Sequence, residues 1–182
     1  KLYTFPNLER HYNEVAYFTQ DDRWWKQLHL VTPHLRRLLE THDCVDIWLL
    51  VHGSKSWWEW LEQLEPELRQ KVRLVYSTGC ADADVANTWL QLGATSYVSH
   101  PGRISASPFF YFYFLRRWLS GVSLEEAVAQ ANARIEPILT SIPRGPRIDP
   151  EKIWLDTRAE LFGQRDIWLG SSEAGSVRGG DR

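Results

Sequence analysis

The sequence lacks the cysteine content of a secreted scaffold and the charge of a nucleic-acid-binding domain. Its 182 residues include two cysteines, Cys44 and Cys80, which make no disulfide framework. Such a pair is typical of reduced thiols in a cytoplasmic protein, although one bridge between them stays open. The formal net charge of -2 leaves no basic surface for nucleic acid. We therefore expect a cytoplasmic protein that does not bind nucleic acid directly.

Long apolar runs are lacking as well. A helix that crosses a bilayer needs roughly 18 or more apolar residues, and the aromatic stretch 109–115 is ended by Arg116 and Arg117. No signal-peptide pattern follows Lys1, which is compatible with a fragment or a processed product whose upstream domains are missing. We expect no transmembrane helix and no membrane partner.

Motifs of several enzyme classes are also absent. The six histidines are scattered and are not paired with acids at the helical spacing of metalloproteases. The sequence contains no glycine-rich loop for phosphate and no Gly-x-Ser-x-Gly elbow for a serine hydrolase. We therefore expect no metal and no cofactor.

The composition that is present is that of a globular protein. Hydrophobic residues make up 43% and charged residues 24% of the chain, whose length is enough to cover both faces of a sheet with helices. We assign most of the 10 tryptophans to the core. One domain is expected over residues 1–169, followed by a disordered tail over 170–182, where glycine, serine and charged residues leave little to bury.

Apolar runs alternate with amphipathic segments in the first half of the chain. The runs that predict strands are residues 14–19, 45–51, 72–76 and 94–99. The segments that predict helices are 23–41, 56–70 and 83–92. Pro33 is expected to kink or divide the first of these helices. Alternation of this kind implies an α/β three-layer sandwich, with a mostly parallel central sheet and helices on both faces.

The second half is mainly helical in pattern. A helix is predicted over residues 107–119, and another begins at Ser123, where Glu126 completes a capping box. The proline-rich residues 141–150 predict a surface connection. Two short strands are predicted at 152–155 and 166–169.

Two residues with catalytic chemistry follow consecutive apolar strands. His52 comes after VDIWLLV, and Cys80 comes shortly after VRLVY. Only one helix is predicted between them, so their strands are expected to be neighbours about 4.8 Å apart, with both residues at the edge where parallel sheets carry their functional crevice. An imidazole and a thiol placed there would reach one substrate carbonyl. Taken alone, a turn histidine and a small core cysteine are the simpler interpretations.

The residues around this pair fit the same chemistry. Gly53 lets the backbone turn sharply, so that its N–H and that of Cys80 are predicted to form an oxyanion hole. The N-terminus of the following helix favours a thiolate at Cys80. Asp82 and Asp84 would oppose this effect if they face the sulfur.

These motifs resemble those of the caspase-like superfamily of cysteine peptidases, which includes caspases, metacaspases, legumains, gingipains, separases and CHAT proteins. The resemblance lies in an apolar strand that ends in His-Gly (WLLVHGS), followed by one that ends in a small residue and cysteine (LVYSTGC). It implies that His52 and Cys80 form a catalytic dyad. Thr78 stands where metacaspase-like members carry an aspartate, so no P1 preference is assigned.

The downstream sequence is similar to the CHAT and gingipain-like members. GATSYVS is followed by an aromatic helix and then by LSGVSLEEA, which fits a pattern L-x-G-x-S-x-x-E-A. Leu161-Phe162-Gly163 is faintly similar to the closing strand of those domains. The resemblance covers roughly residues 45–135. It also suggests a prokaryotic regulatory or defence-type protease that works with regulatory domains or subunits of a larger assembly.

Four more residues are predicted to bind substrate at this edge: Ser99, His100, Arg103 and Asp82. Arg103 would clamp an acidic group, and the alternative for His100 is a solvated loop position. Cys44 opens its strand and is interpreted as structural. The tryptophans at 57, 58 and 60 are assigned to helix packing. Trp58, which lies off the main apolar stripe, is the one that could belong to a recognition surface instead.

The resulting hypothesis is a cysteine endopeptidase acting on a protein or peptide substrate. Cys80 would form a thioester and His52 would act as general base and acid. A catalytically inactive caspase-like protein-interaction module is the alternative, and an unrelated flavodoxin-like binding domain is a third.

Overall fold

A four-stranded, mostly parallel sheet organises the chain. The computed structural model describes residues 3–18, 24–52 and 56–170, and the side chains of all of these except 24–29. The strands are β1 (Val45–Leu49), β2 (Val72–Ser77), β3 (Ser96–Ser99) and β4 (Glu160–Gly163), in the order β1-β2-β3-β4. The pairs β1–β2 and β2–β3 are parallel, whereas β4 runs antiparallel to β3. The predicted α/β class is confirmed.

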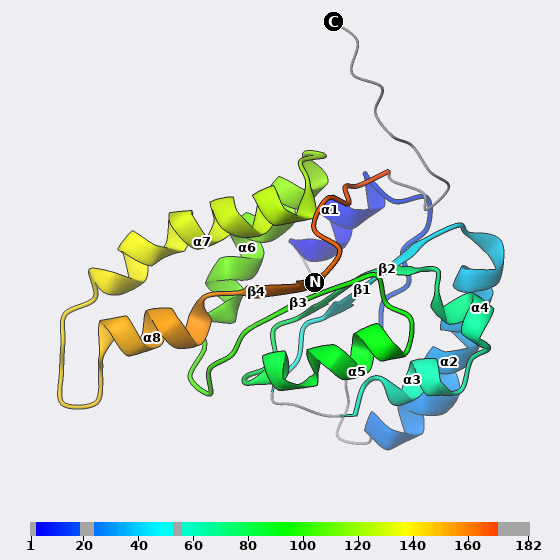
Figure 1. Cartoon of the computed structure of the whole chain (residues 1–182), viewed down its shortest axis with the longest axis horizontal. Coiled ribbons are helices and arrows are strands. Elements are labelled where there is room, and N and C mark those ends of the chain that lie inside the picture. The colour runs from blue at the N-terminus through cyan, green and yellow to red at the C-terminus, as the bar shows by residue number, and fades with distance from the viewer. Residues whose placement is uncertain (1–2, 19–23, 53–55, 171–182) are drawn as a thin grey trace, which may run out of the picture.

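Helices cover both faces of this sheet (Figure 1). On one side lie α2 (Trp24–Thr41), α3 (Glu59–Glu62), α4 (Pro66–Arg69) and α5 (Ala86–Gln91). On the other lie α1 (Thr4–Glu9), α6 (Ser107–Leu119) and α7 (Leu124–Thr140), with α8 (Pro150–Thr157) against α7. Successive residues of β2 point to opposite faces, so Tyr76 joins the α6 core and Val75 the α5 core. The predicted three-layer arrangement is therefore present.

The helices α6 and α7 lie where the sequence predicts them. Gly121 lies between α6 and α7, and its positive φ of 81° ends the helical conformation there. Ser123 is the N-cap of α7, and its Oγ accepts the Glu126 N–H at 3.2 Å. None of the described helices is both long and apolar enough to cross a bilayer.

Three predicted strands are wrong. Residues 14–18 lie beside β1 without pairing with it, and the Glu14 carboxylate is bonded to Arg37 of α2 and to His42. The expected strand at 152–155 is part of α8, whose start is fixed by Pro150 in the first turn and by the Asp149 carboxylate, which accepts two backbone N–H groups. Residues 166–169 form only an isolated bridge, and the closing strand is β4.

Two predicted helices differ in their boundaries. The first predicted helix, 23–41, is present as α2 over its described residues, and Pro33 lies inside α2 without dividing it. The segment 56–70 contains two short helices, since Pro66 starts a new one. The segment 83–92 contains a 3-10 turn, η1 (Asp82–Val85), followed by α5. Thr19, Arg23 and the predicted tail from residue 171 lie outside the described residues.

Candidate active site

The carboxyl ends of β1 and β2 are held side by side. Leu49 is the register partner of Ser77 in this parallel pair. One residue further on, Thr78 donates its N–H to the Leu49 carbonyl at 2.9 Å. Its hydroxyl accepts the Val51 N–H at 2.9 Å and donates to the Val51 carbonyl at 3.0 Å. Thr78 therefore continues the alignment of the two strands to the residue before His52.

His52 and Cys80 leave the sheet at this aligned edge. The His52 side chain is exposed and the Cys80 side chain is half-buried. Within the described residues no hydrogen bond joins the imidazole to the thiol, and the Cys80 N–H donates to no protein acceptor. Gly53, the other predicted oxyanion donor, lies outside the described residues. The edge thus offers an accessible imidazole, a thiol and an uncommitted N–H group.

The loop that carries Cys80 makes a sharp left-handed turn. Ala81 has a φ of 59°, which L-residues other than glycine seldom adopt. The turn is fastened to the loop after β3, because Ala81 donates its N–H to the Gly102 carbonyl at 2.9 Å and Ala83 to the His100 carbonyl at 3.3 Å. Since η1 follows directly, the N-terminus next to Cys80 belongs to a short 3-10 turn and not to the long helix expected. Strained backbone of this kind persists only where surrounding contacts hold it.

Three of the four predicted substrate-binding residues are buried. Ser99 and His100 are 0% exposed and Asp82 is 2% exposed, whereas Arg103 is exposed. The Asp82 side chain is bonded to Ser77, and the His100 side chain is bonded to Thr157 and Tyr76. Contacts of Ser99, His100 and Asp82 with substrate remain predictions, and the burial of these side chains argues against them. The alternative of a solvated loop position for His100 is wrong.

His100 ties the edge of the sheet to α8. Its Nδ1–H donates to the Thr157 carbonyl at 2.5 Å, so Nε2 is the atom that accepts from the Tyr76 hydroxyl at 3.2 Å. This tautomer is neutral. Burial lowers the pKa of His100 to about 4, and the bond to Thr157 only partly offsets that effect.

We expect His100 to make stability depend on pH. Between pH 6.5 and about 4 the unfolded chain binds a proton that the folded chain excludes, so stability falls as the pH falls through this window. From pH 7 to pH 5 the loss is about 2 kcal/mol. It is measured by urea unfolding at both pH values. His100→Gln should remove this loss, and His11→Gln, at an exposed histidine, should keep it. Parallel curves for the wild type and His100→Gln would contradict the assignment.

Cys44 is far from Cys80 along the strands. It precedes the first residue of β1, whereas Cys80 follows the last residue of β2, and no disulfide joins them. The Trp57 side chain is 4% exposed and packs in the α5-side core, with Trp58 and Trp60 half-buried against the same cluster. The described residues contain no group of three or more potential metal ligands.

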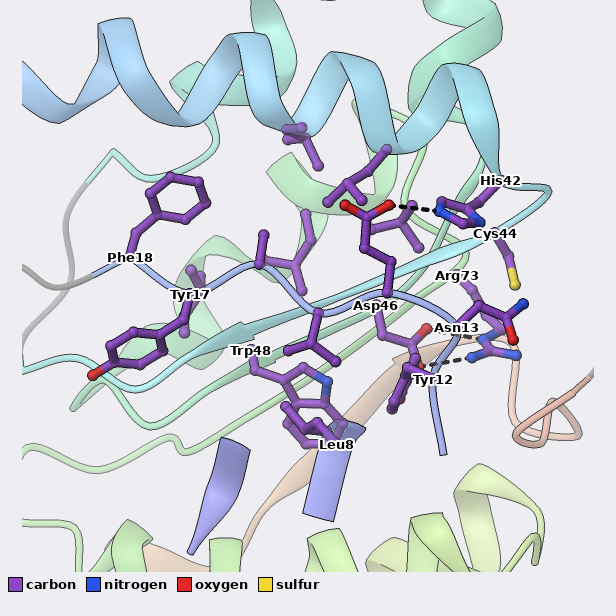
Figure 2. Close-up of a pocket in the computed structure, with 18 of the residues that line it drawn as sticks. Leu8, Tyr12, Asn13, Tyr17, Phe18, His42, Cys44, Asp46, Trp48 and Arg73 are labelled. Atoms are coloured by element: carbon purple, nitrogen blue, oxygen red, sulfur yellow. Dashed lines mark hydrogen bonds and ion pairs between the residues drawn. The ribbon is translucent and has the colours of Figure 1, made fainter. Parts of the chain in front are cut away.

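A cavity of about 1080 Å³ lies between α2, residues 13–18 and the outer edge of β1. Figure 2 shows the Tyr17 and Phe18 rings at one end of it and the paired Asp46 and Arg73 side chains at the other. Its described lining includes neither His52 nor Cys80. Val51, the residue before His52, does line it, so one end of the cavity lies close to the candidate dyad.

Several residues that shape the edge were missed by sequence reasoning. Ser77 bonds to Asp82, Ser107 donates to the Thr78 carbonyl at 2.8 Å, and Asp156 accepts the Gly102 N–H through its carbonyl at 3.1 Å. The only sequence signal for Ser77 is its place three residues before Cys80. No signal points to Asp156, because the sequence does not tell which loop α8 will meet.

Comparisons with known proteins add no family to this geometry. No protein-family model matches the chain, and no curated protein is similar to it at a significant level. The resemblance to caspase-like peptidases therefore stays a prediction from the motifs.

Proposed function

We propose that the protein is a cysteine peptidase whose dyad is His52 and Cys80. The observation that carries the proposal is the adjacency of β1 and β2 as parallel strands, with ends bridged by Thr78, so that both residues emerge at one edge. The exposed imidazole and the partly accessible thiol support it. So does the Cys80 N–H, which is bonded to no acceptor in the described part of the chain and is available for an oxyanion.

The proposed reaction is amide hydrolysis in two steps. The Cys80 sulfur forms a bond to the substrate carbonyl carbon while His52 takes the thiol proton. His52 then gives this proton to the leaving amine as the C–N bond breaks, which leaves a thioester on Cys80. Water attacks the thioester with His52 as base, and the acid product and the free thiol are released. The Cys80 N–H and, as predicted, that of Gly53 bind the oxyanion.

Protein or peptide is the proposed substrate, and the cytoplasm, where thiols stay reduced, is the proposed compartment. The family resemblance suggests regulatory domains or subunits as partners. A catalytically inactive interaction module is the outcome that the test below would favour if the thiol proves inert.

The test is the rate at which iodoacetamide alkylates each cysteine, read by peptide mass spectrometry. Cys80 should react about tenfold faster than Cys44 and lose most of this advantage in His52→Ala, because a base next to a thiol promotes the thiolate. Cys44 serves as the internal control, since His52→Ala should leave its rate unchanged. Hydrolysis of a peptide library should disappear in both Cys80→Ala and His52→Ala. A Cys80 rate that does not respond to His52 would end the proposal.

A further inference from the structure

The loop that carries Cys80 packs against a buried carboxylate, that of Asp82. Asp82 Oδ2 accepts a hydrogen bond from the Ser77 hydroxyl at 2.5 Å, and both side chains are almost completely buried. The Ser77 Oγ in turn accepts the Gly79 N–H at 3.1 Å. The Ser77 hydroxyl thus connects Gly79, the residue before Cys80, to Asp82, two residues after Cys80.

The fit between Gly79 and Asp82 is tight. A Cβ added at Gly79 would overlap the Asp82 carboxylate, so only glycine lets the backbone lie directly on this group. The backbone of Asp82 is fixed as well, because its carbonyl accepts the Tyr97 hydroxyl at 3.1 Å. Burial, and next the charge of Asp82, raise the pKa of Tyr97 above its usual value. The carboxylate is therefore held inside the protein at a fixed place below the loop.

Burying a carboxylate costs free energy that hydrogen bonds to it must offset. Here it closes the chain Asp82–Ser77–Gly79 on the inner side of the loop, while Ala81 is fastened to Gly102 on the other side. The left-handed Ala81 lies between these two attachments. Together they fix the direction in which the intervening Cys80 leaves the backbone.

We propose that Asp82 is a positioning residue that, through Ser77, holds the Cys80 loop in the conformation that presents the thiol at the sheet edge shared with His52. The effect of Asp82 on catalysis rests on the proposed dyad. Its effect on the conformation of the Cys80 loop does not depend on the dyad. Asp82 does not contact substrate in this scheme. It acts on Cys80 through Ser77 and Gly79.

The first measurement is hydrogen–deuterium exchange of residues 78–81. Asp82→Ala and Ser77→Ala should each raise the exchange rate there about tenfold, because each removes one link of the same chain, and the double variant should add little. Asp82→Asn, which keeps an acceptor for the Ser77 hydroxyl, should stay near the wild type. Asp84→Ala, at an exposed acid of the same turn, is the matched control. Ser77→Ala removes a single oxygen and keeps the test open if Asp82→Ala does not fold. Unchanged local exchange in these variants, or an equal rise in α7, would overturn the inference.

The second measurement separates this inference from the proposed function. The alkylation rate of Cys80 is compared with and without His52→Ala, in the wild type and in Ser77→Ala. A His52 effect present in the wild type and about tenfold smaller in Ser77→Ala supports positioning of the dyad. An undiminished effect refutes the positioning of the dyad. No His52 effect in the wild type refutes the peptidase, and the exchange data then decide the inference on their own.

Discussion

Asp46→Ala is expected to lower the free energy of unfolding by about 3 to 5 kcal/mol, because it leaves a guanidinium buried without its counter-ion. Arg73 donates to Asp46 through Nε at 2.9 Å and through Nη2 at 2.8 Å, and the two side chains are 4% and 0% exposed. Burial lowers the pKa of Arg73, but the bonds and charge of Asp46 outweigh it and raise the pKa above its usual value.

A wider network depends on the same carboxylate. The Tyr12 hydroxyl donates to Asp46 at 2.5 Å and accepts the Trp118 Nε1–H at 2.9 Å. The Arg73 guanidinium also lies over the Trp118 ring, 5.3 Å from its centroid. Asp46 and Arg73 occupy the second positions of β1 and β2, at the end of the sheet opposite His52. Their role is therefore structural, since the functional crevice of a parallel sheet lies at the carboxyl ends.

Urea unfolding followed by circular dichroism measures this loss. Arg165→Ala, which breaks the exposed pair with Glu125, is the control and should cost less than about 1 kcal/mol. The double variant Asp46→Leu with Arg73→Met should be more stable than Asp46→Ala, because apolar side chains of similar size remove the unpaired charge. A loss of less than about 1 kcal/mol in Asp46→Ala would show that Arg73 finds another partner.

Gly163→Ala should cost about 4 kcal/mol, at the upper end of single substitutions. Gly163 ends β4 with a φ of 81°, and an added Cβ would overlap the Thr95 carbonyl oxygen. That carbonyl also accepts the Gln164 N–H at 3.0 Å, so it does not move without disturbing the pairing of β4 with β3. The conformational cost and the overlap therefore add.

Gly121 provides a control with the same backbone conformation. Its φ is also 81°, but a Cβ there would meet nothing within 4 Å. Gly121→Ala should then cost only the left-handed conformation, about 1 to 2 kcal/mol. Equal losses in the two variants, measured by urea unfolding, would mean that the close approach at Thr95 contributes nothing.

The central part of the fold could be predicted from sequence because its signals are local. Near-continuous apolar runs mark the edge strand β1 and the fully buried strand β2, and the alternation with helices implies the parallel sheet. The same reasoning failed at 14–18 and 152–155. Aromatic and β-branched residues favour a strand in both segments, but residues 14–18 do not join the sheet, and the cap at Asp149 starts a helix over 150–157 instead.

The candidate dyad was found from sequence for a related reason. The order of two apolar strands with one crossover is enough to bring His52 and Cys80 to the same edge of the sheet. The roles of the residues around them could not be predicted from the strand order. Asp82 and His100 were predicted at the edge, yet sequence position does not tell whether a polar side chain points into solvent or under a loop.

The sequence by itself thus determined the α/β class, the pairing of β1 with β2 and the helices α6 and α7, since periodicity, caps and crossover rules act within short stretches of chain. Tertiary structure alone decided the buried Asp46–Arg73 pair, the support of the Cys80 loop by Ser77 and Asp82, and the tie from His100 to Thr157. Two of these contacts join residues 27 and 57 positions apart. Even the nearer bond between Ser77 and Asp82 exists only because the loop folds back under the sheet edge and excludes water from both groups.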